Sequence, residues 1–248
     1  MDSGRIALCE NRRAIAPHGT RTASSACTKR RSAWSSLLVG ALVWLVAAPA
    51  ASAKPVVLTV HGGGYFLFDA ASMTRQVAAF EAQGFKVESV EYQLGNIRAG
   101  WRDVRAAVRR YPRRHIYAYG ESAGAGYAGL LATTKLIDGA VLQSPLVDLR
   151  PLWGPTQGQL FSCTTPSCWR RFSAVLKRPK QPVLEFVPLD DQIASPDSSL
   201  LWDRRNRRVR AVTYPGIHGM PSPKGLDADL RRAGRFFWRQ HSHQTSDR

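Results

Sequence analysis

Short, nearly continuous apolar runs recur between residues 55 and 214, and amphipathic stretches separate them. Each run has the length of a strand, and an unbroken apolar run is typical of a strand that is buried on both faces. We predict six strands, at residues 55–60, 86–92, 115–119, 140–143, 182–187 and 209–214. Buried strands that alternate with helices indicate an α/β fold with a mostly parallel, doubly wound sheet.

The stretches between the strands repeat their apolar residues every three or four positions, as amphipathic helices do. In residues 98–111, Trp101, Val104 and Val108 fall on one face, and Pro112 ends the pattern. We predict helices at residues 69–83, 98–111, 123–135 and 227–240, followed by a frayed polar tail at residues 242–248. The strands and helices together predict one domain over residues 54–241.

The first 53 residues have the organisation of an export signal. A long polar, Arg-rich stretch precedes an apolar run at residues 34–48, and Ala51-Ser52-Ala53 has the form of a cleavage site. The apolar run is short for a membrane span, although a retained membrane anchor is the alternative. We therefore expect a secreted or otherwise extracytoplasmic protein whose mature chain begins at Lys54.

Residues 147–180 break the alternation of strands and helices. This segment is rich in Pro, Gly, Ser, Thr and Trp, and we predict that it forms a small lid above the sheet edge. It contains Cys163 and Cys168, whereas Cys9 and Cys27 fall in the expected export signal. Two thiols so close together in an exported protein predict a local disulfide, with a metal pair or a redox pair as the alternatives.

The chain is strongly basic, with a formal net charge of +17. A surface of this kind attracts anionic surfaces weakly, but a nucleic-acid partner would need a recognition motif as well. The sequence contains no zinc finger, helix-turn-helix or basic motif interleaved with aromatic residues, so we expect no nucleic-acid partner. The sequence does not determine the oligomeric state.

Gly120-Glu121-Ser122-Ala123-Gly124 follows the strand predicted at residues 115–119 and precedes a helix of small residues. A G-x-S-x-G sequence between a strand and a helix is typical of a nucleophile elbow, a sharp turn that presents a serine hydroxyl above the sheet. The flanking glycines leave room for the neighbouring strand and helix. We predict Ser122 as a nucleophile beside a helix N-terminus, where developing negative charge is favoured.

Three further polar elements come directly after predicted strands. His61-Gly62-Gly63-Gly64 follows the first strand, Asp190-Asp191 the fifth and His218 the sixth. Because the carboxyl ends of parallel strands meet at one edge of a sheet, we expect these elements to come together there. His218 is the predicted base that activates Ser122, and an aspartate is needed to orient its imidazole.

Asp190 and Asp191 compete for the role of orienting acid. We favour Asp191, because it begins Asp191-Gln192-Ile193-Ala194, a run of an acid, a polar, a hydrophobic and a small residue that turns away from the end of the strand. The other aspartate would then be a helix cap or a solvated loop acid. Asp148 and Asp197 are weaker alternatives.

An oxyanion that forms beside Ser122 needs preorganised N–H donors. We assign this role to Ala123, which follows the nucleophile, and to Gly63 and Gly64, because a chain without side chains can aim its amides into a pocket. His61 is expected to brace the glycine loop through hydrogen bonds rather than to transfer protons.

The His61–Gly64 loop and the Gly120–Gly124 motif together resemble the hormone-sensitive-lipase branch of the α/β-hydrolase family, and the resemblance covers most of residues 55–240. It implies a carboxylic ester hydrolase that forms an acyl-enzyme, without a metal or an organic cofactor. The run that begins at Asp191 also resembles the acid loop of secreted cutinase-like hydrolases. The predicted elements do not include the cap helices of the lipase branch, so we expect a lightly covered site that suits short or extended esters.

We therefore predict an exported serine esterase or lipase that acts on a small-molecule or lipid ester. A serine peptidase of the same fold is one alternative, which a propeller or a pocket acid for a substrate amine would favour. A non-catalytic binder of anionic surfaces is the other. Such binders tend to lose at least one catalytic group, whereas Ser122, His218 and a candidate acid are all present here.

Overall fold

The structure is a computed structural model that describes residues 53–112, 114–152 and 154–246. The export signal expected over residues 1–53 lies outside these residues except for Ala53, and so do Cys9, Cys27 and the last two residues of the chain. Within the described ranges, no helix combines the length and the apolar character that crossing a membrane requires.

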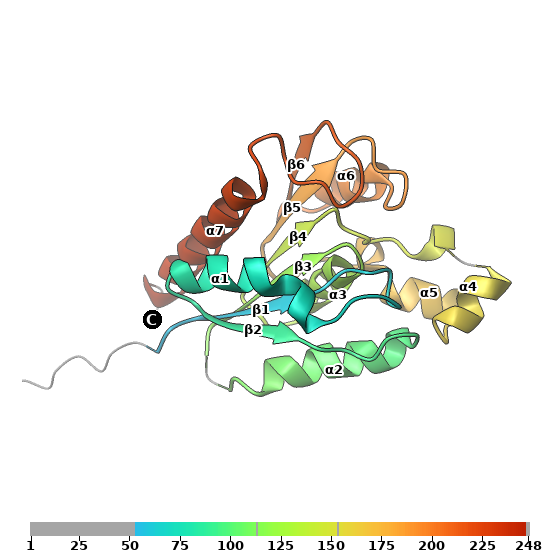
Figure 1. The fold of residues 1–248 in the computed structure, drawn as a ribbon, viewed down its shortest axis with the longest axis horizontal. Coiled ribbons are helices and arrows are strands. Elements are labelled where there is room, and N and C mark those ends of the chain that lie inside the picture. Colours follow the sequence, from blue (N-terminus) through green and yellow to red (C-terminus); the bar gives the residue numbers. More distant parts are fainter. Residues whose placement is uncertain (1–52, 113, 153, 247–248) are drawn as a thin grey trace, which may run out of the picture. The chain divides into compact units, whose positions relative to one another are not determined.

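A six-stranded sheet forms the centre of the fold, and all of its neighbouring strands are parallel (Figure 1). Across the sheet the strands lie in the order β2-β1-β3-β4-β5-β6. They are β1 (Val56–Val60), β2 (Lys86–Val90), β3 (Ile116–Glu121), β4 (Gly139–Gln143), β5 (Val183–Pro188) and β6 (Val209–Tyr214). The predicted α/β fold with a parallel sheet is confirmed.

Helices cover both faces of the sheet (Figure 1). One face carries α1 (Thr74–Ala82) and α7 (Leu226–Ser246), which contact each other. The other face carries α2 (Ile97–Arg109), α3 (Ala123–Ala132), α5 (Pro166–Phe172) and α6 (Pro196–Arg205). Shorter elements are α4 (Pro155–Leu160) and the 3₁₀ helices η1 (Ala70–Met73), η2 (Arg150–Leu152) and η3 (Ala174–Leu176).

The alternation of side chains along the central strands explains why these strands are apolar throughout. In β1, Val56, Leu58 and Val60 belong to the core on the side of α2 and α3, whereas Val57 belongs to the core on the side of α1 and α7. All four side chains are fully buried. A strand that is covered on both faces has no polar side, which is the pattern that the sequence displays.

α6 is a helix that the pattern of apolar residues does not predict. Its sequence contains few apolar residues, and Ser199 and Trp202 are its only buried side chains. The start signals were present, because Pro196 occupies the first turn and Asp197 lies close to the positive end of the helix dipole. The Trp202 indole is fully buried and donates a hydrogen bond to the Lys177 carbonyl. One large side chain therefore fixes a helix whose periodicity is too weak to predict.

The segment at residues 147–180 is partly core and partly surface. Cys163 and Cys168 form the predicted disulfide. Trp169 and Phe172 of α5 are buried in the core that also includes α3, so this half of the segment is anchored to the domain. Leu160, at the end of α4, is exposed, and α4 lies at the periphery of the fold (Figure 1). Residues 164–167, 170 and 171 are exposed as well, so the surface part of the segment extends beyond α4.

α7 continues to Ser246, so the frayed tail expected from residue 242 does not begin there. Hydroxyl groups near its end bond back to carbonyls one turn earlier, from Ser242 to Trp238, from Thr245 to His241 and from Ser246 to Ser242. Hydroxyl–carbonyl bonds of this kind are compatible with a helical backbone, which the polar composition alone did not reveal.

Glu185 is a buried carboxyl group in the middle of the sheet. It lies on β5 between Leu142 of β4 and Ala211 of β6, and its exposed fraction is 0%. Among the described residues, neither of its carboxyl oxygens has a hydrogen-bond partner. Burial, with a smaller effect of Asp203, raises the pKa of Glu185 well above its ordinary value of 4.5, so the native protein holds this side chain in its neutral form.

This burial predicts a pH-dependent cost in stability. Above pH 4.5 the unfolded chain releases the Glu185 proton and the native state retains it, so the free energy of unfolding should fall as the pH rises. Glu185→Gln removes this titration. As the pH rises, the free energy of unfolding of the wild type should fall relative to that of the variant by up to about 1.4 kcal/mol per pH unit, until the native carboxyl ionises. Urea unfolding between pH 4 and pH 8 measures the difference. Glu81→Gln, at an exposed position on α1, is the control. A constant difference across this range would contradict the assignment.

Candidate active site

Ser122 occupies the sharp turn between β3 and α3. Its backbone dihedrals are φ 50° and ψ −114°, a conformation that residues other than glycine rarely adopt. Hydrogen bonds hold the turn in this shape, because the Ser122 N–H donates to the Gln143 carbonyl at 2.9 Å and the Ser122 carbonyl accepts from Gly126 and Leu146. The strained backbone is thus fixed by β4 and α3 on either side.

The two glycines of the G-x-S-x-G motif are required by contacts within the fold. A Cβ atom on Gly120 would overlap the backbone of Gly124, and a Cβ atom on Gly124 would overlap the carbonyl oxygens of Val60 and His61. These contacts are with backbone atoms, which cannot rotate away as a flexible side chain would. The first turn of α3 can therefore approach the end of β1 only if both positions lack a side chain.

Ser122, His218 and Asp191 form a continuous chain of hydrogen bonds. The Ser122 Oγ lies 2.8 Å from His218 Nε2, and His218 Nδ1 lies 2.7 Å from Asp191 Oδ2. The Asp191 side chain is completely buried, and 15% of the His218 side chain is exposed. The three residues come from loops that follow β3, β6 and β5, so the structure brings together side chains that are far apart in the sequence.

The two neighbouring aspartates have different partners. Asp191 uses its second oxygen, Oδ1, to accept hydrogen bonds from the N–H groups of Ile193 and Ala194, at 2.9 and 2.8 Å. Its carboxylate is therefore oriented by the turn that follows it. Asp190 instead accepts a hydrogen bond from the Gly216 N–H at 3.0 Å and is exposed. Of the two, Asp191 is the acid that lies against His218.

The loop that carries His218 is anchored at the end of β4, by Gln143 and the residue that follows it, a contact that was not among the predictions from the sequence. Gly219, next to His218, donates its N–H to Ser144 Oγ at 3.1 Å. The Met220 carbonyl accepts hydrogen bonds from Gln143 Nε2 and from the Tyr214 hydroxyl, at 3.2 and 2.6 Å. The available signal was the Gln143-Ser144 pair directly after an apolar strand, at the same sheet edge as the other polar elements.

The glycine loop after β1 is braced by aromatic residues. The His61 ring is fully buried and stacks on Tyr92, with ring centroids 4.1 Å apart. The Tyr92 hydroxyl donates to the carbonyls of His61 and Gly62, both at 3.1 Å. Burial lowers the pKa of His61, so the neutral ring is favoured. His61 contacts the loop, and among the described residues it is not hydrogen-bonded to Ser122. Tyr92 braces the same loop and was not predicted from the sequence.

The predicted oxyanion donors lie in backbone conformations that leave their amides free. Gly63 and Gly64 have φ values of +89° and +63°, and among the described residues their N–H groups take part in no hydrogen bond. Ala123 is the first residue of α3, so its N–H has no intrahelical acceptor. Of the three loop glycines, Gly62 is the one at which an added Cβ would meet Ser122, at 3.3 Å from the Ser122 Cβ, whereas a Cβ at Gly63 or Gly64 would meet residues 66–68. The glycine loop and the nucleophile are therefore in contact.

Exposed hydrophobic side chains occupy the loops that carry the site. We call this set the apolar rim, and it comprises Phe66, Leu67, Phe68, Leu189, Ile193, Ile217 and Met220. Ile217 precedes His218, and Ile193 belongs to the turn that orients Asp191. Clusters of exposed apolar residues commonly mark binding sites. The rim therefore places exposed apolar surface on the loops that carry the site.

No protein-family model matches the chain, and no curated protein sequence matches it. The fold does match solved structures. Esterase 2 of Thermogutta terrifontis, in its apo form, has a TM-score of 0.64 at 18% identity, over 75% of this chain and 83% of that chain. A truncated carbohydrate esterase from gut microbiota has a TM-score of 0.64 at 17% identity, over 77% and 87% of the two chains.

A further match is the acetyl ester-xyloside bifunctional hydrolase of Caldicellulosiruptor lactoaceticus, with a TM-score of 0.63 at 18% identity, over 77% of this chain and 84% of that chain. At these identities the likeness shows a shared fold. Because one fold can host many different reactions, the chemistry of this chain depends on its own residues.

The contacts of Gly124 predict a specific sensitivity to substitution. Gly124→Ala should lower the free energy of unfolding by about 2–3 kcal/mol, because the added methyl group overlaps two backbone oxygens that cannot move independently. Gly139→Ala on β4 is the matched control, since the added Cβ would lie 3.5 Å from its nearest neighbouring atoms, an ordinary contact distance. Denaturant unfolding of both variants measures the effect. Equal losses would show that the close approach of α3 to β1 is not the constraint.

Proposed function

We propose that this protein is a serine carboxylic ester hydrolase in which Ser122 is the nucleophile, His218 the general base and Asp191 the orienting acid. The observation that carries the proposal is the Ser122–His218–Asp191 chain, with distances of 2.8 and 2.7 Å, on a strained turn beside a helix N-terminus. This is the arrangement by which a serine hydroxyl becomes nucleophilic in acyl transfer. The esterases among the solved structures with this fold give the proposal independent support.

In the proposed reaction, Ser122 Oγ attacks the ester carbonyl while its proton passes to His218 Nε2. Asp191 stabilises the imidazolium that forms, and its two bonds from backbone N–H groups keep it aligned. The N–H of Ala123, with those of Gly63 and Gly64, would stabilise the oxyanion. His218 then protonates the leaving alcohol. Water attacks the acyl-enzyme by the reverse route, which releases the acid and restores the Ser122 hydroxyl. No step requires a metal or an organic cofactor.

The apolar rim supports an ester with a small apolar group as substrate. Structures of Thermogutta terrifontis esterase 2 have been determined with butyrate and with propionate bound, and that protein shares the fold of this chain. The most exposed side chains of the rim, Phe68 and Ile193, are both 63% exposed, so they offer a shallow surface rather than a deep tunnel. We infer that short acyl chains are preferred.

We infer, in addition, that the protein acts outside the cytoplasm. The Cys163–Cys168 disulfide supports this proposal, because such bonds persist mainly in oxidising compartments. The apolar run at residues 34–48 followed by Ala51-Ser52-Ala53 is the sequence evidence for export.

The first test concerns the nucleophile. Ser122→Ala should reduce the hydrolysis of p-nitrophenyl butyrate by about a thousandfold or more, since the attacking hydroxyl is lost and only binding and oxyanion stabilisation remain. The measurement is the initial rate of p-nitrophenol release by the purified protein. Ser198→Ala on α6 is the matched control and should retain the wild-type rate. Equal rates for wild type and Ser122→Ala would remove Ser122 from the mechanism.

The second test separates the two aspartates. Asp191→Asn should lower kcat by at least about a hundredfold, because the amide can donate a hydrogen bond to Nδ1 and stabilise the wrong tautomer of His218. Asp190→Asn is the control at the adjacent position and should stay within a few-fold of wild type, since its carboxylate contacts only the Gly216 N–H. The reverse order of the two effects would assign the acid to Asp190.

A further inference from the structure

A basic groove lies between α7 and the edge strand β6, apart from the Ser122–His218 pair. It consists of two adjoining hollows with volumes of about 560 and 550 Å³. Lys224, Arg232 and Arg235 line both hollows, so the two form one elongated groove. Volumes of this size are typical of sites for small molecules.

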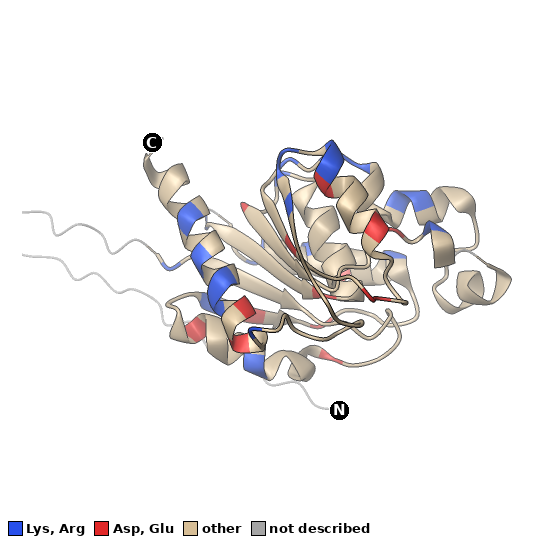
Figure 2. Cartoon of the chain, turned by 90° about the horizontal axis from the view of Figure 1, so that it is seen from above, with Lys and Arg blue, Asp and Glu red and all other residues tan. Residues whose placement is uncertain are grey.

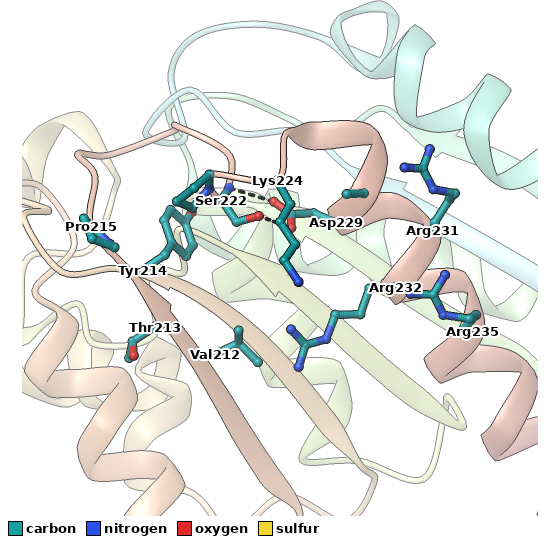
Figure 3. Close-up of a pocket in the computed structure, with 12 residues that line it drawn as sticks. Val212, Thr213, Tyr214, Pro215, Ser222, Lys224, Asp229, Arg231, Arg232 and Arg235 are labelled. Carbon is teal, nitrogen blue, oxygen red and sulfur yellow. Dashed lines mark hydrogen bonds between the residues drawn. The ribbon is translucent and has the colours of Figure 1, made fainter.

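The cations of the groove are six side chains, and we refer to them together as the groove cations. They are Arg210, Lys224, Arg231, Arg232, Arg235 and Arg239. Figure 2 shows basic residues on successive turns of α7, and Figure 3 shows Lys224 and Arg232 extending into the space between α7 and β6. Six basic side chains from α7, β6 and the loop between them therefore face one groove.

None of the six groove cations takes part in an ion pair within the described part of the chain. Among the described residues, Asp229 is the only acid that lines the groove, and it accepts hydrogen bonds from the Ser222 N–H and hydroxyl at 2.8 and 2.6 Å (Figure 3). Burial and the neighbouring charges of Arg210, Arg235 and Arg239 lower the pKa of Arg232, and the opposing effect of Asp229 does not cancel them. The cations repel one another, and an anion would relieve that repulsion.

The spacing of the cations indicates a ligand with more than one charged group. Arg231, Arg235 and Arg239 follow one another at intervals of four residues on α7. Four residues of a helix rise by about 6 Å, so this row extends over about 12 Å, which is longer than a single oxyanion. Guanidinium groups bind phosphate oxygens in pairs and carry their charge at every physiological pH.

The lining argues against the two larger classes of anionic partner. Single-stranded nucleic acid is held in part by bases that stack on exposed aromatic rings. The aromatic residues of this groove are Tyr214, which is buried, and Phe236, which is half-buried. A flat membrane surface, in turn, does not fit a hollow whose central cation, Arg232, is itself half-buried.

We propose that the groove between α7 and β6 binds a small oligoanion that carries two or more phosphate groups, such as an oligophosphate or the phosphate end of a larger molecule. The bound phosphates lie along the arginine row of α7, and Arg210 and Lys224 contact them from the side of β6 and its following loop. This site is separate from the proposed esterase chemistry, and its occupancy is measured without any ester substrate.

The test is isothermal titration calorimetry of the full chain with tripolyphosphate at fixed ionic strength. Wild type should bind tripolyphosphate at least tenfold more tightly than orthophosphate. Arg235→Gln with Arg239→Gln, both at exposed positions, should weaken this binding at least tenfold. Arg98→Gln with Arg102→Gln on α2 makes the same change in net charge at exposed positions and should alter the Kd less than twofold. Circular dichroism verifies that both variants are folded.

Several outcomes would overturn the proposal. Equal weakening by the two double variants would show an effect of net charge alone, and a wild type without saturable binding would remove the site. If a single-stranded oligonucleotide, or vesicles with anionic lipid, bound more tightly than tripolyphosphate, the ligand of the groove would be that class of partner and not an oligophosphate. If the α7 double variant does not fold, Arg210→Gln on β6 should weaken tripolyphosphate binding at least threefold, and an unchanged Kd would exclude the groove.

Discussion

The contact between the first turn of α3 and the end of β1 is the constraint on which the site depends. β1 and β3 are parallel neighbours with Val60 opposite Gly120, so the helix that follows β3 starts directly beside the last carbonyls of β1. Gly124 meets those carbonyls without a side chain. The backbone of Ser122 is thereby fixed in a conformation that it would not adopt alone. The packing of α3 against β1 therefore sets the position of the Ser122 hydroxyl, and the loops after β5 and β6 have to bring Asp191 and His218 to it.

The order of the strands in the sheet explains how His218 and Asp191 come to lie beside Ser122. Ser122 follows β3, Gln143 ends β4 and Ser144 follows it, Asp191 follows β5, and His218 follows β6. These four strands are consecutive neighbours in the sheet. Each polar element is therefore placed beside the next by the hydrogen bonding of the sheet. Gln143 and Ser144 have no role in proton transfer in the proposed mechanism. They connect Ser122 to His218, because Gln143 bonds to the Ser122 backbone and both residues bond to the His218 loop.

The sequence predicted the features that rest on local patterns. Continuous apolar strands, the glycine motif and polar residues at strand ends are each visible in a few adjacent letters, and they led to the parallel sheet and to the meeting of Ser122, His218 and an aspartate. The features it did not predict rest on single long-range contacts. α6 depends on Trp202, and the bracing of the glycine loop depends on Tyr92, a residue about thirty positions away from it. Such contacts leave no periodic trace in the sequence.

α7 connects the site and the basic groove through one loop. Ser222 lies four residues after His218, and its two hydrogen bonds to Asp229 attach the far end of the His218 loop to α7. Pro215 and Ser222 of the same loop also line the groove. Asp229 thus holds the loop, and among the described residues it is also the one acid that faces the six groove cations. A single negative charge leaves the groove with an excess of positive charge in the folded protein, and the loop that carries His218 is attached to the helix that supplies most of that charge.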